Sequence, residues 1–269
     1  MAKHACMQIF LLSLGFIIFT TNSWSDPLDD VVKATGGTTV YVKDKGKNEN
    51  PKNMSTILNT LQNKDKVILY KVYNVPAENG GMINFVVDPD MQQADILISG
   101  KKDLPEVQLI GPNNETINSP ATHFGYTLLL QPNTLTPGNW TLKFTATTPV
   151  DISITAGSQY YLVTEDFVKM MLGHEGFDYY PYEGKLQPGA SLVFGAAMTG
   201  KGMKVSKIEI IDLTGRVLMA ADAVPNDLYD PTRYAKLTIP PQAFEIMVLG
   251  QDSAGHPFQR MVDKVFNVR

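Results

Sequence analysis

The stretch "FEIMVLGQDSAGHPFQR", residues 244–260, gives the clearest indication of the fold of this chain. Phe244, Ile246 and Val248 alternate with other side chains and so take one side of a β-strand, because successive strand residues point to opposite faces. Asp252 to Gly255 follow as a turn, with glycine at the position that tolerates a positive φ. The stretch is therefore predicted to be a β-hairpin.

Working outward, residues 160–269 are predicted to form an all-β block. Asp212 to Arg216 read as a further hairpin turn that contains Gly215. Six or seven strands fit this block, the number of an immunoglobulin-like or fibronectin-III-like sandwich. The expected strands are Leu192–Phe194, Lys207–Ile211, Val217–Met219, Ala235–Ile239, Phe244–Leu249 and Met261–Val265.

An earlier block, residues 67–157, has the same character. Short apolar runs are separated by turn signals such as Glu78-Asn79-Gly80-Gly81 and Pro137-Gly138. Trp140 is expected to face the core together with Leu142 and Phe144. The expected strands are Val67–Leu69, Met82–Val87, Asp95–Ser99, Glu106–Ile110, Thr127–Leu130, Trp140–Phe144 and Val150–Thr155.

The N-terminal residues 1–25 have the pattern of a cleaved secretory signal. Lys3 and His4 give a basic start, Ile9 to Phe19 form an apolar core, and small residues precede Asp26. The apolar core is shorter than the roughly 20 residues of a membrane-spanning helix. The mature chain is therefore expected to begin at Asp26, to be secreted, to have no membrane span and to lack Cys6, the only cysteine.

Residues 26–66 are the only part with helical signals. Val31, Val32 and Thr35 share one face of a predicted helix, and Gly36-Gly37 are expected to end that helix. Thr38 to Lys43 are expected as a strand, and Met54, Ile57, Leu58 and Leu61 lie on one face of a second helix. These elements are too few to close a core, so they must pack on something else.

Two of these regions resemble a known family. "VLGQDSAGHPFQR" is similar to the end of the C-terminal β-sandwich of hemicentins and related extracellular proteins with a von Willebrand factor A domain. "LDDVVKATGGTTVYV" followed by "MSTILNTLQNKDKVILYKVYN" resembles the last helix–strand–helix of such an A domain. The resemblance implies a mainly β protein: a signal at 1–25, an A-domain remnant at 26–66, and two sandwiches at 67–157 and 158–269.

Three sequons for N-linked glycosylation occur, at Asn53, Asn114 and Asn139. Asn114 and Asn139 follow Gly-Pro-Asn and Pro-Gly, which form surface turns. Asn53 stands where the second helix is expected to start, so its side chain is also a candidate helix cap.

Catalytic and cofactor motifs are incomplete. The run 195–202 matches a phosphate-binding loop except at Gly202, where a hydroxyl residue is needed. His174-Glu175 lacks the second histidine of a zinc-protease motif, and Asp151-Ile152-Ser153 is read as strand rather than as a metal-binding motif. We therefore expect no catalytic residue, no cofactor and no metal.

The aromatic run Phe177, Tyr179, Tyr180 and Tyr182 is the candidate partner-binding segment. Exposed tyrosines suit interfaces, whereas the alternative is a strand with core aromatics. Asp178 in its middle favours partial exposure, so replacing Tyr179 and Tyr182 is expected to weaken binding without unfolding the protein.

The formal net charge of −4 and the lack of a Lys/Arg cluster argue against nucleic acid as a partner. The favoured hypothesis is a secreted, non-enzymatic glycoprotein that binds an extracellular protein or matrix component, as resemblance to hemicentins implies. One alternative is a secreted effector, such as a venom, salivary or mineral-matrix component. Another is an unrecognised hydrolase or metal-dependent enzyme.

Overall fold

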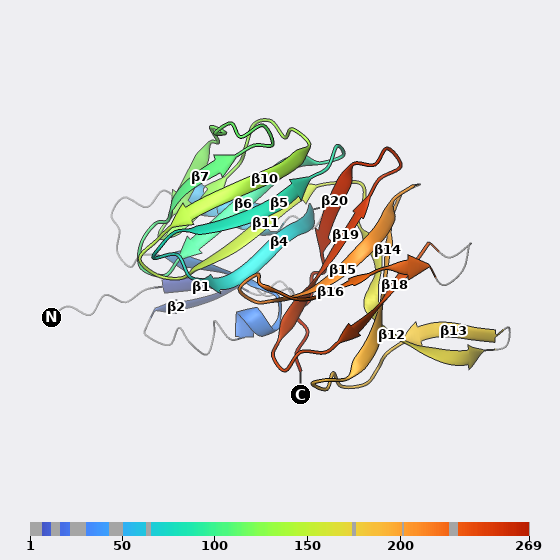
Figure 1. The fold of residues 1–269 in the computed structure, drawn as a ribbon. Coiled ribbons are helices and arrows are strands. Elements are labelled where there is room, and N and C mark those ends of the chain that lie inside the picture. The colour runs from blue at the N-terminus through green and yellow to red at the C-terminus, as the bar shows by residue number, and fades with distance from the viewer. Residues whose placement is uncertain are drawn as a thin grey trace. The chain divides into compact units, whose positions relative to one another are not determined.

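The computed structural model is mainly β (Figure 1). It describes residues 7–11, 17–21, 31–42, 51–62, 66–173, 176–200, 202–225 and 231–268. The chain divides into two compact units, Met1–Ser158 and Gln159–Arg269.

The first unit contains a β-sandwich made of two antiparallel sheets. One sheet has three strands in the order β5-β10-β7, and the other has five in the order β4-β11-β6-β9-β8. Their bounds are β4 Lys66–Val75, β5 Gly81–Val87, β6 Gln92–Gly100, β7 Glu106–Ile110, β8 Ala121–Phe124, β9 Thr127–Leu130, β10 Gly138–Thr145 and β11 Val150–Gly157.

The core of the first sandwich follows the period of two that its sequence shows. Trp140, Leu142 and Phe144 of β10 are almost completely buried, as expected, while Asn139 before them and Lys143 among them are exposed. They pack against inward-facing residues of the second layer, including Ile152 and Ile154 of β11. The Trp140 indole N–H donates a hydrogen bond to the carbonyl of Thr136, 2.8 Å away, so the buried ring keeps its polar group satisfied.

Residues 31–42 and 51–62 pack on the face of the five-stranded sheet that is turned away from the other sheet. Residues 31–34 are helical, and Gly36 (φ 68°) ends the helix as expected, with the Gly37 N–H bonded to the Val32 carbonyl. Strand β3 (Thr38–Val42) and helix α2 (Pro51–Gln62) follow. A separate apolar cluster joins them to the sheet through Val40, Ile57, Leu97, Phe124 and Leu129, with Met54, Leu58 and Leu61 at its margin.

Strands β1 (Met7–Leu11) and β2 (Ile17–Thr21) lie within the predicted signal segment. β1 pairs with both β2 and β3 in a three-stranded antiparallel sheet. Their pairing does not test whether residues 1–25 are removed, which stays a prediction. The expected cleavage site before Asp26 and residues 43–50 lie outside the described residues.

The second unit also consists of two antiparallel sheets, ordered β13-β12-β14-β18-β17 and β16-β15-β19-β20. Their bounds are β12 Leu162–Gly173, β13 Gly176–Pro181, β14 Ser191–Met198, β15 Lys204–Asp212, β16 Val217–Asp222, β17 Val224–Pro225, β18 Arg233–Thr238, β19 Phe244–Gln251 and β20 Pro257–Met261.

Four aromatic rings occupy the centre of this unit. Phe167, Phe194, Phe244 and Phe266 are each almost completely buried, and their ring centroids lie 5.1–6.3 Å apart. Edge-to-face and offset contacts of this kind add stability beyond the area buried.

The C-terminal hairpin forms as predicted. Phe244, Ile246 and Val248 are buried on one side of β19, and the Gly255 N–H bonds to the Asp252 carbonyl with Gly255 at φ 87°. The expected strand Met261–Val265 is wrong, because the strand is β20, Pro257–Met261. Beyond it the chain leaves the ladder and returns through a bridge between Phe244 and Phe266.

No strand is expected from the sequence at β1, β2, β8, β12 or β17, and a strand at β13 is expected only as an alternative. The described part of the second unit has nine strands, β12 to β20, which is more than the six or seven expected. The mainly β fold class itself is confirmed.

Candidate interaction site

The segment that carries the predicted aromatic run forms a two-stranded ribbon in the second unit. Residues 168–173 of β12 pair with residues 176–181 of β13 through the register Val168↔Pro181 to Gly173↔Gly176. β12 pairs with β14 only up to Val168, so the ribbon continues beyond the sheet. Figure 1 shows it projecting from the other strands of its unit. β13 is the edge strand of its sheet.

The ribbon exposes large apolar side chains. Met170, Met171 and Tyr180 are 55%, 44% and 41% exposed. Cross-strand pairs place Lys169 beside Tyr180 and Met171 beside Asp178, so these four residues share one face, which we call the outer face of the ribbon. A surface of methionine and tyrosine rimmed by single charges has the composition of a protein interface.

The opposite face of the ribbon is anchored. Tyr179 stacks on Tyr234 of β18, with ring centroids 4.1 Å apart and 26° between the ring planes. The Tyr234 ring lies over Gly195 of β14, where an added Cβ would come within 3.1 Å of it. Glycine at position 195 therefore leaves room for the aromatic stack, and the stack holds the ribbon against its own sheet.

The predicted aromatic residues therefore separate into different environments. Tyr180 is exposed, and Tyr179 is half-buried in its stack. Tyr182 packs at the margin of the core of the second unit, with its hydroxyl 3.3 Å from the Lys185 carbonyl. The backbone of Phe177 lies in β13, but its side chain is outside the described residues.

Asn114 and Asn139 are both exposed, whereas Asn53 is half-buried. Asn114 lies in a turn with φ 61°, and Asn139 is the second residue of β10. Asn53 is the third residue of α2, so the expected cap role is wrong. Its amide nitrogen instead donates to the His123 carbonyl of β8 at 2.9 Å.

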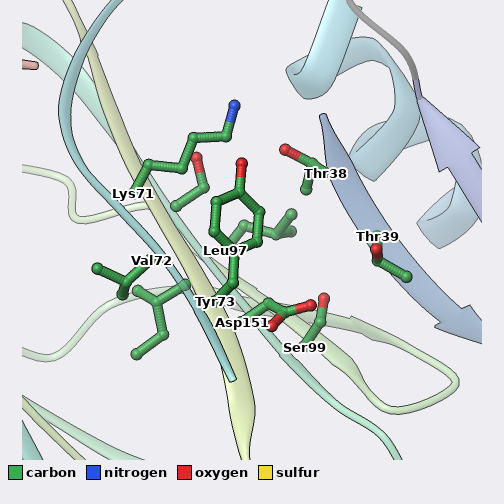
Figure 2. Close-up of a pocket in the computed structure, with 10 residues that line it drawn as sticks. Thr38, Thr39, Lys71, Val72, Tyr73, Leu97, Ser99 and Asp151 are labelled. Atoms are coloured by element: carbon green, nitrogen blue, oxygen red, sulfur yellow. The ribbon is translucent and has the colours of Figure 1, made fainter. Parts of the chain in front are cut away.

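A small cavity lies between β3 and the five-stranded sheet (Figure 2). Its volume is about 10 Å³, close to the minimum that one water molecule requires. The Lys71 ammonium donates to the Gly36 carbonyl, and the Tyr73 hydroxyl donates to the Gly37 carbonyl at 2.9 Å. The cavity is too small for a metabolite. The two hydrogen bonds at its edge instead fasten Gly36 and Gly37 to the sheet.

Asp151 has a structural role in this cavity. It lies in β11, as predicted, and its carboxylate accepts the Asn74 N–H at 2.7 Å. Asn74 has φ 53° at an irregularity in the pairing of β4 with β11. Asp151 therefore satisfies a backbone donor that the bulge removes from the ladder.

The described residues of the incomplete catalytic motifs lie in ordinary strands and bends. Gly195 to Met198 are the end of β14, and a turn follows. His256 follows the Asp252–Gly255 turn, and its Nδ1 lies 2.9 Å from an Asp252 carboxylate oxygen. That hydrogen bond is the main reason why the pKa of Asp252 is lowered. His174 lies outside the described residues.

One acidic side chain has a strongly shifted pKa. The pKa of Glu165 in β12 is raised from 4.5 to about 7, mainly by burial and further by the charges of Asp263 and Asp166, while Lys264 opposes the shift. Glu165 is half-buried. In the described part of the chain no three acidic, histidine or cysteine side chains gather in a way that could hold a metal ion.

These observations define a protein of two β-sandwich units, the second of which carries a surface ribbon. Residues 66–159 match the family described as "Hemicentin galactose-binding domain-like". The first sandwich is therefore a hemicentin-like β-sandwich region. The match begins after α2, so the resemblance of residues 26–66 to a von Willebrand A domain remains a prediction.

Other comparisons give distant likenesses only. No curated protein matches the chain significantly. The Bacillus licheniformis lipase BlEst2 in its propeptide form is 10% identical, with a TM-score of 0.34 over 75% of this chain and 43% of the lipase. β-Glucuronidases from Parabacteroides merdae and Ruminococcus gnavus are 6% and 8% identical, with TM-scores of 0.27 and 0.24 over 73% and 100% of this chain.

The chain spans 28% of the P. merdae enzyme and 47% of the R. gnavus enzyme. Likenesses this weak carry no argument about activity. No helix within the described ranges is long and apolar enough to cross a membrane.

Tyr234, Met170 and Met171 are residues of the site that sequence reasoning missed. The signal was present in Leu162–Gly173, which contains Val163, Phe167 and Val168 in a run typical of strands. A strand predicted there would also have suggested a hairpin with the aromatic run that follows it. Tyr234 gives no local signal, because its partner is 55 positions away in the chain.

Proposed function

We propose that this chain is a secreted, non-enzymatic glycoprotein that acts in extracellular matrix adhesion or assembly. The observation that carries the proposal is the match of residues 66–159 to the hemicentin domain family. The signal pattern of residues 1–25 supports the secretory route.

Partner binding is assigned to the outer face of the ribbon. Lys169, Met171, Asp178 and Tyr180 give that face two apolar side chains flanked by one charge of each sign. β13 adds an edge strand, whose backbone groups are able to receive a strand from a partner. The stack of Tyr179 on Tyr234 holds the ribbon in one orientation, which lowers the entropy lost on binding.

Expression of the full chain in secretory eukaryotic cells tests this function. We expect the protein in the matrix that the cells deposit, with Asp26 as its first residue. Protein that remains only in the medium favours a secreted effector. Protein that stays in the cells with Met1 as its first residue contradicts the extracellular assignment.

A further inference from the structure

The two exposed sequons lie at the same end of one sheet. Asn114 is held in a turn closed by the Gly111 N–H bonding to the Glu115 carbonyl and the Asn114 N–H bonding to the Gly111 carbonyl. This turn extends from the end of β7. Asn139 stands at the start of β10, which pairs antiparallel with β7.

The turn packs directly against the start of β10. A Cβ added to Gly138 would lie 2.6 Å from the Cβ of Pro112, so glycine is required for this close approach. Asn139 points away from the core, because Trp140 beside it is fully buried. Sugars on Asn114 and Asn139 would therefore emerge side by side into solvent.

Asn53 has a different environment. Its Nδ2 atom, to which a glycan would be attached, donates to the His123 carbonyl. Helix α2 is also held on the sheet by Ile57 and its apolar neighbours. A sugar on Asn53 would have to occupy the space between α2 and β8, so glycosylation there competes with docking of the helix.

We propose that the chain carries N-linked glycans at Asn114 and Asn139 and none at Asn53, so that sugar covers one end of the β5-β10-β7 sheet. In this modification the asparagine Nδ2 displaces a polyprenyl diphosphate from the C1 atom of its linked oligosaccharide. A C–N bond forms, the C–O bond to the diphosphate breaks, and the amide loses one proton. The inference rests on the secretory route of the proposed function.

A consequence concerns where partners can approach the first sandwich. Bulky hydrophilic sugar at the Asn114–Asn139 end excludes protein contact from that end of the sheet. The ribbon belongs to the other unit and carries no sequon, since none of the three lies beyond Asn139. The glycan positions therefore leave the proposed binding face unmodified.

The test is the mass of the secreted full chain before and after enzymatic release of N-glycans in ¹⁸O-water, which marks each occupied asparagine. We expect marks at positions 114 and 139 only. Asn114→Gln and Asn139→Gln should each remove one glycan. Ser55→Ala, which destroys the third sequon but keeps the Asn53 amide, should leave the mass of the glycans unchanged.

A mark at position 53 in folded, secreted protein, or its absence at 114 or 139, overturns the inference. If the N-terminus of the chain does not direct secretion, the proposed function fails. In that case a foreign signal sequence placed ahead of Met1 brings the full chain to the glycosylation machinery. Marks at 114 and 139 alone in that material still support the glycan assignment, and any other pattern refutes it.

Discussion

Tyr179 of β13 and Tyr234 of β18 stack with 4.1 Å between their ring centroids and 26° between their planes. This contact joins the ribbon to a strand to which it has no backbone pairing. Because aromatic pairs contribute about 0.5–1.5 kcal/mol beyond their buried area, the stack fixes the ribbon without making it part of the core.

The Tyr234→Ala substitution should therefore loosen the ribbon. We expect faster hydrogen exchange at the amides of residues 169–180 and a loss of about 1 kcal/mol in the free energy of unfolding. Tyr180→Ala is the matched control, since this tyrosine is exposed, and its exchange pattern should match the wild type. Equal exchange in the Tyr234 variant and the wild type would show that the ribbon holds its position without the stack.

The bond from the Asn74 N–H to Asp151 gives a second prediction. Asp151→Ala removes the acceptor of this half-buried donor, which costs about 1 kcal/mol of stability in the first unit. Urea unfolding followed by Trp140 fluorescence measures the change. Thr155→Ala, on the same face of β11, is the control with an expected change below about 0.5 kcal/mol. A similar change in the free energy of unfolding for both variants would contradict the role assigned to Asp151.

The raised pKa of Glu165 predicts how the free energy of unfolding depends on pH. Its pKa in the folded state is about 7 against 4.5 unfolded, so between these values the folded state holds a proton that the unfolded state releases. The stabilisation that the raised pKa of Glu165 gives the folded state is complete below pH 4.5, and it is lost as the pH rises to about 7. Glu165→Gln should flatten the fall in unfolding free energy over this window, and Glu183→Gln, an exposed control, should not. An unchanged slope in the Glu165 variant contradicts the assignment.

Neither chelator nor reductant should change the unfolding temperature of the mature protein. The only cysteine lies in the predicted signal, and the described residues form no cluster of metal ligands. Thermal unfolding with and without each reagent measures this directly. A fall of several degrees with chelator would reveal a metal site outside the described residues.

Much of the fold was predictable because alternating patterns dominate it. The turns at Gly36 and Gly255 and the burial of Trp140 follow from local sequence. The strand expected at Met261–Val265 failed because Phe266 is drawn back to Phe244, a tertiary contact that an apolar run does not reveal. The same limit applies to β8, whose four residues include His123 and give a weak signal.

The exposure of the aromatic run was predictable only in part, and its role in binding stays a prediction. The aromatic run suggested a surface, and Tyr180 is indeed exposed. The sequence could not separate Tyr179, which stacks on Tyr234, from Tyr182, which borders the core. Tyr182 is therefore a poor choice for a binding test, because its replacement would also reduce stability.

The most direct test of the central claim is retention of the purified full-length protein on extracellular matrix deposited by cultured cells. Met171→Ser with Tyr180→Ser should weaken binding about tenfold or more, because we expect these two side chains together to contribute at least about 1.4 kcal/mol, which equals a tenfold change in affinity. The unfolding midpoint should stay unchanged. Met82→Ser, at a 61% exposed methionine of β5, should bind like the wild type. Undiminished binding by the ribbon variant, or an equal loss in the Met82 variant, would contradict the account.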